Sequence, residues 1–171
     1  LHTPKLLKLL PWQADLDLTL SPQNWRVLLY RSALKRLHFN FDNYESNERE
    51  VHKKNLETKY KTALLRNLPR MKKSLDTISL KMDDIEFALI LLGILSQTTL
   101  SLSSLKDLQL FLTPSWKFVS SQAIANNTIS LRETLGCITY LSWPYRDCFS
   151  AFFSAGNLEN LRELDLKLSM L

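Results

Sequence analysis

The sequence contains little glycine and no long apolar run. Its 171 residues include three glycines, too few for the turns of a hairpin-rich β protein or for glycine-rich loops that wrap phosphates. The longest apolar stretch, residues 85–95, contains Glu86 and Gly93 and falls well short of the roughly 20 residues that cross a bilayer. These absences predict an α-helical, soluble protein with no membrane-spanning segment.

Cysteine and histidine are also scarce. Cys137 and Cys148 have no histidine between them, because His2, His38 and His52 all lie in the first third of the chain. This pattern offers no zinc ligand set, and no serine or carboxylate stands near a histidine at a spacing typical of a catalytic triad, although triads assemble in space. We expect two buried, reduced thiols, no catalytic residue, no metal and no cofactor, and therefore no enzyme.

Charge of one sign is concentrated in a single segment. The net charge is +5 and the pI about 9.3, a modest excess that is compatible with an acidic partner without requiring one. Residues 59–73 contain six basic side chains and no acidic one. This segment suits the solvated side of an amphipathic helix or a surface that faces nucleic acid, and no aromatic side chain suited to stacking on bases accompanies it in the sequence.

Leucine dominates what is present. There are 37 leucines, and 45% of the residues are hydrophobic, enough for the core of one domain. Ser21 before Pro22 is a helix entry signal, and Asp83-Asp84 precede an almost entirely apolar helix that we expect to be central. Glu86 in that helix needs hydration near the helix end or a partner such as Arg146 or Arg162. The predicted helices cover residues 22–37, 48–68, 71–78, 85–95, 103–112, 130–141 and 145–171; residues 12–20 are a short strand or an extended connection, and 38–50 a loop or hairpin.

Several segments, taken in chain order, resemble the ligand-binding domain of nuclear receptors. KLLP at residues 8–11 is similar to the end of that family's third helix, and LSPQNWRVLLYRSALKRL at residues 20–37 to its signature. SLKMDDIEFALILLGIL at residues 79–95 resembles its eighth helix, and residues 149–171 its tenth and eleventh. The chain departs from the family at Asn24 and Trp25, where the signature has Asp-Gln, and it lacks the twelfth helix with its coactivator-clamping glutamate.

The resemblance implies an all-α fold, a three-layer helical sandwich formed by one domain over residues 1–171 that is incomplete at both ends. It implies a ligand-regulated transcription factor domain in the nucleus, with the cytoplasm as the alternative. The lipophilic ligand would be bound by Leu6, Leu9, Leu29, Ser32, Leu75, Ile78, Leu161 and Leu164. A coregulator peptide would be bound by Lys8, Val27 and Leu28, a homo- or heterodimer partner by the C-terminal helix, and DNA only by a domain outside this chain.

Two other classes of function remain open. One is a helical scaffold or adaptor that binds only proteins through an exposed leucine-rich face, a role that also fits the L-x-x-L-L match at residues 6–10. The other is a basic helical module that binds nucleic acid through residues 59–73. The three hypotheses differ in what the protein should bind: a lipophilic molecule, a protein partner, or a nucleic acid with an affinity that falls as salt is added.

Overall fold

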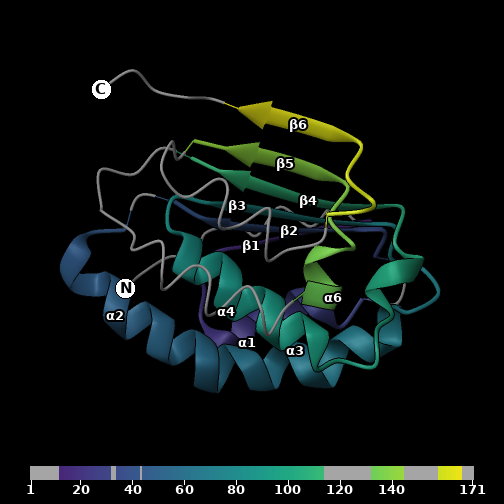
Figure 1. Cartoon of the computed structure of the whole chain (residues 1–171). Helices are drawn as coiled ribbons and strands as arrows, with labels where there is room; N and C mark the ends of the chain where they lie inside the picture. The colour runs from purple at the N-terminus through teal and green to yellow at the C-terminus, as the bar shows by residue number, and fades with distance from the viewer. Residues whose placement is uncertain (1–11, 32–33, 43, 114–131, 145–157, 167–171) are drawn as a thin grey trace.

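Parallel strands alternate with helical segments along the chain (Figure 1). The computed structural model describes residues 12–31, 34–42, 44–113, 132–144 and 158–166. The strands are β1 (Gln13–Leu16), β2 (Arg36–Phe41), β3 (Thr77–Met82), β4 (Asp107–Leu112), β5 (Tyr140–Trp143) and β6 (Glu163–Leu166). The helical segments are α1 (Pro22–Leu29), α2 (Ser46–Asn55), η1 (Leu56–Tyr60), α3 (Lys61–Asn67), η2 (Leu68–Met71), α4 (Ile85–Ser96), η3 (Leu102–Ser104) and α6 (Arg132–Leu135).

The strands form one six-stranded sheet in which the order in space is the order in the chain. Each strand is parallel to the one before it and adds to the same edge. Because crossovers between parallel strands share one hand, connections that always advance in one direction lie on one face of the sheet. The helices indeed lie together on one side (Figure 1), where α1 contacts α3, α3 contacts α4, and α4 contacts α6.

This arrangement is a two-layer solenoid with one strand in each turn. The register shows the length of each turn as the distance in sequence between paired residues. It is 23 residues from Gln13 to Arg36, 41 from Arg36 to Thr77 and 30 from Thr77 to Asp107. It is 31 residues from Gln109 to Tyr140 and 23 from Tyr140 to Glu163. The long second turn contains α2, η1, α3 and η2, which follow one another without a break.

The core lies between the sheet and the helices. Alternate strand residues point toward the helices and form columns across the sheet, each member at most 1% exposed: Ala14, Leu37, Ile78 and Leu108; Leu16, Phe39, Leu80, Leu110 and Leu141; and Phe41, Met82, Leu112 and Trp143. Leu18, two residues after β1, is also buried in this core. From the helical side, Trp25 of α1 contacts Phe39, Phe41 and Tyr60, and α4 is buried over most of its circumference.

The predicted all-α, three-layer helical sandwich is therefore wrong, because the six-stranded parallel sheet makes this an α/β fold. The error has a definite source. Residues such as Leu75, Ile78 and Leu80 contain an apolar pair three positions apart, which fits one helix face, and a pair two positions apart, which fits one strand face. Pairing with neighbouring strands selected the second pattern in β2, β3 and β4.

Some of the predicted helices are confirmed, and others are strands in the structure. The Ser21 cap is confirmed, since its hydroxyl accepts from the Asn24 N–H at 3.1 Å, but α1 ends at Leu29. The apolar helix is confirmed as α4, with Asp84 accepting from the Glu86 N–H, and the helix predicted over residues 48–68 is close to the run from α2 to α3. The helices predicted over residues 71–78, 103–112 and 130–141 instead contain all or part of strands β3, β4 and β5, and β6 lies in the predicted last helix.

In the described part of the chain, no helix has the length and apolar character needed to cross a bilayer.

Candidate functional site

No helix of the described residues covers the second face of the sheet, which we call the open face, and its side chains form rows across the strands. Strand alternation places every second residue on this face, where it is half-buried or exposed except for the small Ser142. The first row, in register across the sheet, is Asp15, His38, Ser79, Gln109, Tyr140 and Glu163. The second row is Asn40, Lys81, Phe111, Ser142 and Asp165.

Aromatic side chains occupy one part of this open face, next to carboxylates. The rings of Phe111 and Tyr140 lie 4.6 Å apart, and Glu163 and Asp165 stand on the adjoining strand β6. Burial first, and then the charges of Asp165 and Glu163, raise the pKa of Tyr140, so its hydroxyl stays protonated. This part of the face offers ring surface and negative charge, which complement a partner carrying basic and apolar side chains.

Three residues of the first row have the composition of a hydrolytic triad. Asp15, His38 and Ser79 occupy successive strands in register. A triad requires the imidazole to hydrogen-bond both partners, yet in the described part of the chain His38 bonds neither Asp15 nor Ser79. Tertiary structure therefore brought together residues that sequence spacing had kept apart, without the hydrogen bonds of an assembled triad.

His38 should nevertheless make folding pH-dependent. Its burial lowers the pKa, an effect that Asp15 and Asp42 oppose and Lys81 reinforces. Because the folded-state pKa lies below the ordinary value of about 6.5, the unfolded chain binds this proton more readily. The His38 contribution to the free energy of unfolding is thus fully present above about pH 6.5 and falls as the pH is lowered through the folded-state pKa.

We expect urea unfolding to show this loss between about pH 7.5 and 5.5, and the His38→Gln variant to show less of it. The comparison is between the slopes of unfolding free energy against pH for the two proteins. Equal slopes would show that His38 titrates alike in the folded and unfolded chain.

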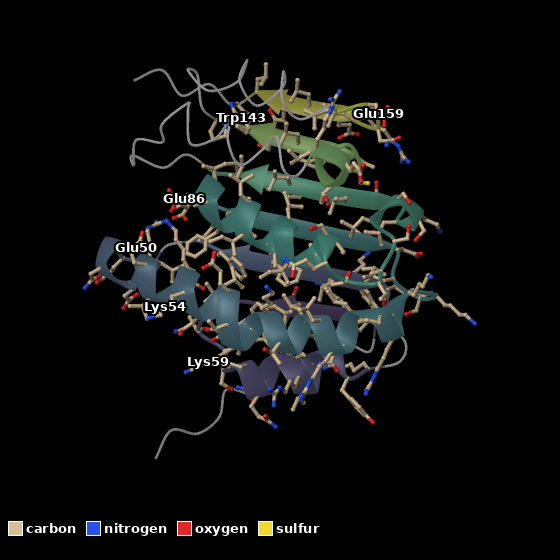
Figure 2. The ribbon with its side chains drawn as sticks, turned by 60° about the horizontal axis from the view of Figure 1, so that its bottom comes forward. Glu50, Lys54, Lys59, Glu86, Trp143 and Glu159 are labelled. Atoms are coloured by element: carbon tan, nitrogen blue, oxygen red, sulfur yellow. The ribbon has the colours of Figure 1, made fainter. Side chains whose placement is uncertain are left out.

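An ionic network ties α2 to the start of α4. Arg49 donates to both carboxylate oxygens of Asp83, at 2.9 and 2.6 Å, and Lys53 lies 3.1 Å from an Asp84 oxygen and 2.5 Å from Glu86. Hydrogen bonding to Asp83 raises the pKa of Arg49 despite its burial. Hydration of Glu86 near the helix end is confirmed, since its side chain is 52% exposed in the first turn of α4, and its ion-pair partner is Lys53. The predicted partner Arg162 lies instead 3.8 Å from Asp107, and Arg146 falls outside the described residues. Glu50 and Glu86 mark this edge of the molecule in Figure 2.

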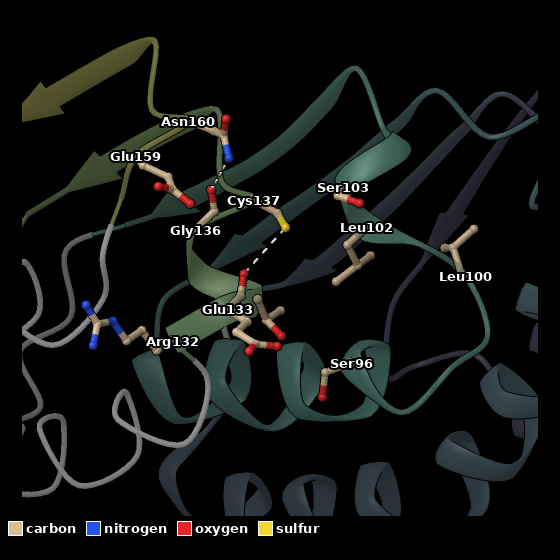
Figure 3. A pocket seen from close by; sticks show the side chains of 11 residues that line it. Ser96, Leu100, Leu102, Ser103, Arg132, Glu133, Gly136, Cys137, Glu159 and Asn160 are labelled. Carbon is tan, nitrogen blue, oxygen red and sulfur yellow. Dashed lines mark hydrogen bonds between the residues drawn. The ribbon is translucent and has the colours of Figure 1, made fainter.

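A second polar feature is a hollow of about 690 Å³ between the end of α4, η3 and α6. Figure 3 shows Cys137 in its wall, with the thiol directed to the Glu133 carbonyl at 3.5 Å. Cys137 is a free, half-buried thiol, and burial, with help from Glu159 and Glu133, raises its pKa. A thiol with a raised pKa is a poor nucleophile at neutral pH, so the hollow has no activated group of this kind.

The residues predicted to bind a lipophilic ligand do not converge on one cavity. Leu29 is buried beside the first strand, Leu75 and Ile78 belong to the core at the third, and Leu161 and Leu164 lie at the sixth. Leu29 and Leu164 are thus at opposite ends of the sheet, with Leu75 and Ile78 between them at the third strand. Leu6, Leu9 and Ser32 fall outside the described residues.

The residues predicted to bind a coregulator peptide are also separated in character. On α1, Val27 is 52% exposed while Leu28 is buried in the core. The two do not floor a common groove, and Lys8 is outside the described residues. The stripe of residues 149–168 predicted as a dimer face falls largely outside them too, and its described part ends in strand β6.

Sequence reasoning missed the open face because its residues are mixed in type. The available signal was the apolar alternation beside them, as in Leu37, Phe39 and Phe41, which identifies strands and hence their outward neighbours. No group of three or more potential metal-ligating side chains occurs among the described residues.

Comparisons with known proteins add no family. No protein family, no curated protein and no solved structure matches the chain. The resemblance to nuclear receptors therefore stays a prediction.

Proposed function

We propose that the chain is a solenoid binding module whose open sheet face holds a protein partner. The observation that carries the proposal is a six-stranded parallel sheet whose described helices all lie on one face, which leaves rows of side chains in register on the other. Solenoids present extended binding surfaces of this kind. The strand pattern, as in Leu105, Leu108 and Leu110, is also similar to the L-x-x-L-x-L of leucine-rich repeats.

The charge of the open face indicates the chemistry of the partner. Asp15 stands at one end of the first row and Glu163 at the other, with Asp165 beside it, while Lys81 lies 3.5 Å from Asp42 and is thereby compensated. A further row on this face, formed by Gln13, Arg36, Thr77 and Asp107, adds one charge of each sign. The face therefore presents more negative than positive charge, around an aromatic pair. A segment with lysine or arginine next to apolar side chains would satisfy both features, because the rings attract cations and the carboxylates pair with them.

This proposal keeps the predicted alternative of a scaffold that binds only proteins, but it places the binding surface on the open face of the sheet instead of on a leucine-rich helical face. The lipophilic ligand, the coregulator peptide and the nuclear location stay predictions of the resemblance. They receive no support from the positions of the residues assigned to them.

The test is selection of a displayed random peptide library on the immobilised protein. We expect enrichment of peptides that combine basic and aromatic or aliphatic residues, and we expect Phe111→Ser or Glu163→Lys to weaken the selected peptides by about tenfold or more, as for truncation of a hot-spot residue.

The matched control is Val51→Ser, which removes an exposed apolar side chain from α2 on the helical side. It should leave binding unchanged. Peptides that lose affinity for Val51→Ser and keep it for Phe111→Ser would move the binding surface to the helices.

A further inference from the structure

The amino-terminal ends of the strands form a second surface, of opposite charge. Main-chain hydrogen bonds place four segments side by side there: the Lys35 and Arg36 N–H groups donate to the Trp12 carbonyl at 2.8 and 2.9 Å, Asp76 N–H to the Lys35 carbonyl at 2.8 Å, and Lys106 N–H to the Asp76 carbonyl at 2.9 Å. Neighbouring strands lie about 4.8 Å apart, so the side chains of these segments follow one another in a line.

Basic side chains dominate this edge. We call it the basic rim and define it by Arg31, Lys35, Arg36, Arg70, Lys72, Lys73 and Lys106, together with the aromatic Trp12 and Tyr30. Among the described residues of these four segments, the acidic side chains are Asp76, which lies 4.0 Å from Lys106, and Asp107, which lies 3.8 Å from Arg162. The half-buried Arg31 is bonded within the protein, and the six exposed cations against two carboxylates still leave a positive surface.

Two exposed aromatic rings lie among these cations. Trp12 is 42% exposed with the Arg36 guanidinium 5.7 Å from its ring centre, and Tyr30 is 70% exposed with the Arg70 guanidinium at 4.9 Å. In the sequence both rings are distant from residues 59–73, whose own aromatic residue, Tyr60, is buried. Folding brings the exposed ring of Tyr30 to Arg70 and so supplies an accessible one.

We propose that the basic rim binds single-stranded nucleic acid. Phosphates would pair with the cations, and bases would stack on the rings of Trp12 and Tyr30, a combination typical of sequence-tolerant binding to single strands. A linear row of cations fits an extended polyanion better than a flat lipid surface, and exposed rings serve bases in a way that an acidic peptide does not use. This function is separate from protein binding at the open face, and it replaces the face of the long helix as the nucleic-acid surface.

The experiment is a titration of the full chain with a fluorescent single-stranded oligonucleotide of about 16 nucleotides, a length within the range bound by one small domain. Affinity should fall steeply as salt is added. A plot of the logarithm of the association constant against the logarithm of the salt concentration should have a slope of about −0.7 for each phosphate neutralised. Trp12→Ala and Tyr30→Ala should each weaken binding about 5- to 150-fold, as stacking energies of about 1–3 kcal/mol require. Lys72→Glu with Lys73→Glu should weaken it by about tenfold or more.

Matched controls separate a site from general charge. Lys54→Glu with Lys59→Glu makes the same change of charge on exposed side chains of α2 and η1 (Figure 2), about 20 Å or more from Lys72 along the helical axis. It should weaken binding far less than the rim pair. Trp12→Phe should retain the affinity, because a phenyl ring also stacks on a base.

Three outcomes would overturn the proposal. The first is no salt-sensitive binding to the oligonucleotide. The second is an equal loss of affinity in the rim pair and the Lys54 and Lys59 pair, which would indicate attraction by net charge alone. The third is unchanged affinity in Trp12→Ala and Tyr30→Ala, with polyglutamate or phosphatidylserine vesicles bound as well as the oligonucleotide, which would assign the rim to an acidic protein or a membrane.

Discussion

Replacement of Arg49 by alanine should lower the free energy of unfolding by about 3–5 kcal/mol, because it removes the guanidinium that donates two hydrogen bonds to the buried Asp83 carboxylate. Arg49 and Asp83 are both buried, and their paired hydrogen bonds at 2.9 and 2.6 Å join α2 to the residue pair that opens α4. The loss should appear in urea or thermal unfolding as a lower midpoint with an unchanged dependence on denaturant.

Two further variants show whether the loss of stability arises from the charge of Asp83 once Arg49 is removed. Arg49→Met combined with Asp83→Leu removes both charges, and we expect it to recover most of the stability. Arg66→Ala removes an exposed arginine from α3 and should change the unfolding free energy by less than about 0.5 kcal/mol. A double variant as unstable as Arg49→Ala would mean that shape and hydrogen bonding, and not the uncompensated charge, set the cost.

Replacement of Trp25 by alanine should cost about 3–5 kcal/mol of unfolding free energy, through lost packing and the cavity it leaves. Trp25 is fully buried, with its ring centre 4.5 Å from that of Tyr60 and 5.8 Å from that of Phe39. Its indole N–H donates to the Asp17 carbonyl at 2.8 Å, which fixes α1 to the end of the first strand. Chemical unfolding monitored by circular dichroism measures the effect.

The chain contains its own control for this substitution. Trp12→Ala removes the same side chain type from an exposed position on the basic rim, so it should lower the unfolding free energy far less than Trp25→Ala while it weakens oligonucleotide binding. Trp25→Phe keeps an aromatic ring but leaves the Asp17 carbonyl without its donor, at a cost of about 1–3 kcal/mol. Equal destabilisation by Trp12→Ala and Trp25→Ala would contradict the position of Trp25 in the core.

The ionic network around Arg49 and Lys53 and the packing around Trp25 are connected through aromatic contacts. Phe41 lies between Trp25 and Phe87, with ring centres 6.2 and 5.7 Å away, and the Lys53 ammonium stands 5.5 Å from the Phe87 ring. Phe41 of β2 thus connects α1 with α4, and through Lys53 with α2. Damage at either end should therefore loosen the layer that keeps the central strands, and with them the open face, in place.

Local patterns in the sequence determined several features correctly. The Ser21 cap, the apolar helix preceded by Asp83-Asp84 and the long helical run before Pro69 depend on interactions between residues a few positions apart, which the order of residues shows directly. The leucine content also determined that a large core exists. None of these features required knowledge of which distant segments meet.

Tertiary structure alone decided the sheet, the open face and the basic rim. The strands pair with partners 23 to 41 residues away, as from Gln13 to Arg36 and from Arg36 to Thr77, and such pairing leaves no local trace beyond a short alternation that also fits a helix face. The same long-range pairing put Asp15 beside His38 and Lys35 beside Asp76, while packing of the helices put Lys53 beside Glu86 and Tyr30 beside Arg70. These contacts depend on the direction in which successive strands add to the sheet, which is a property of the whole chain.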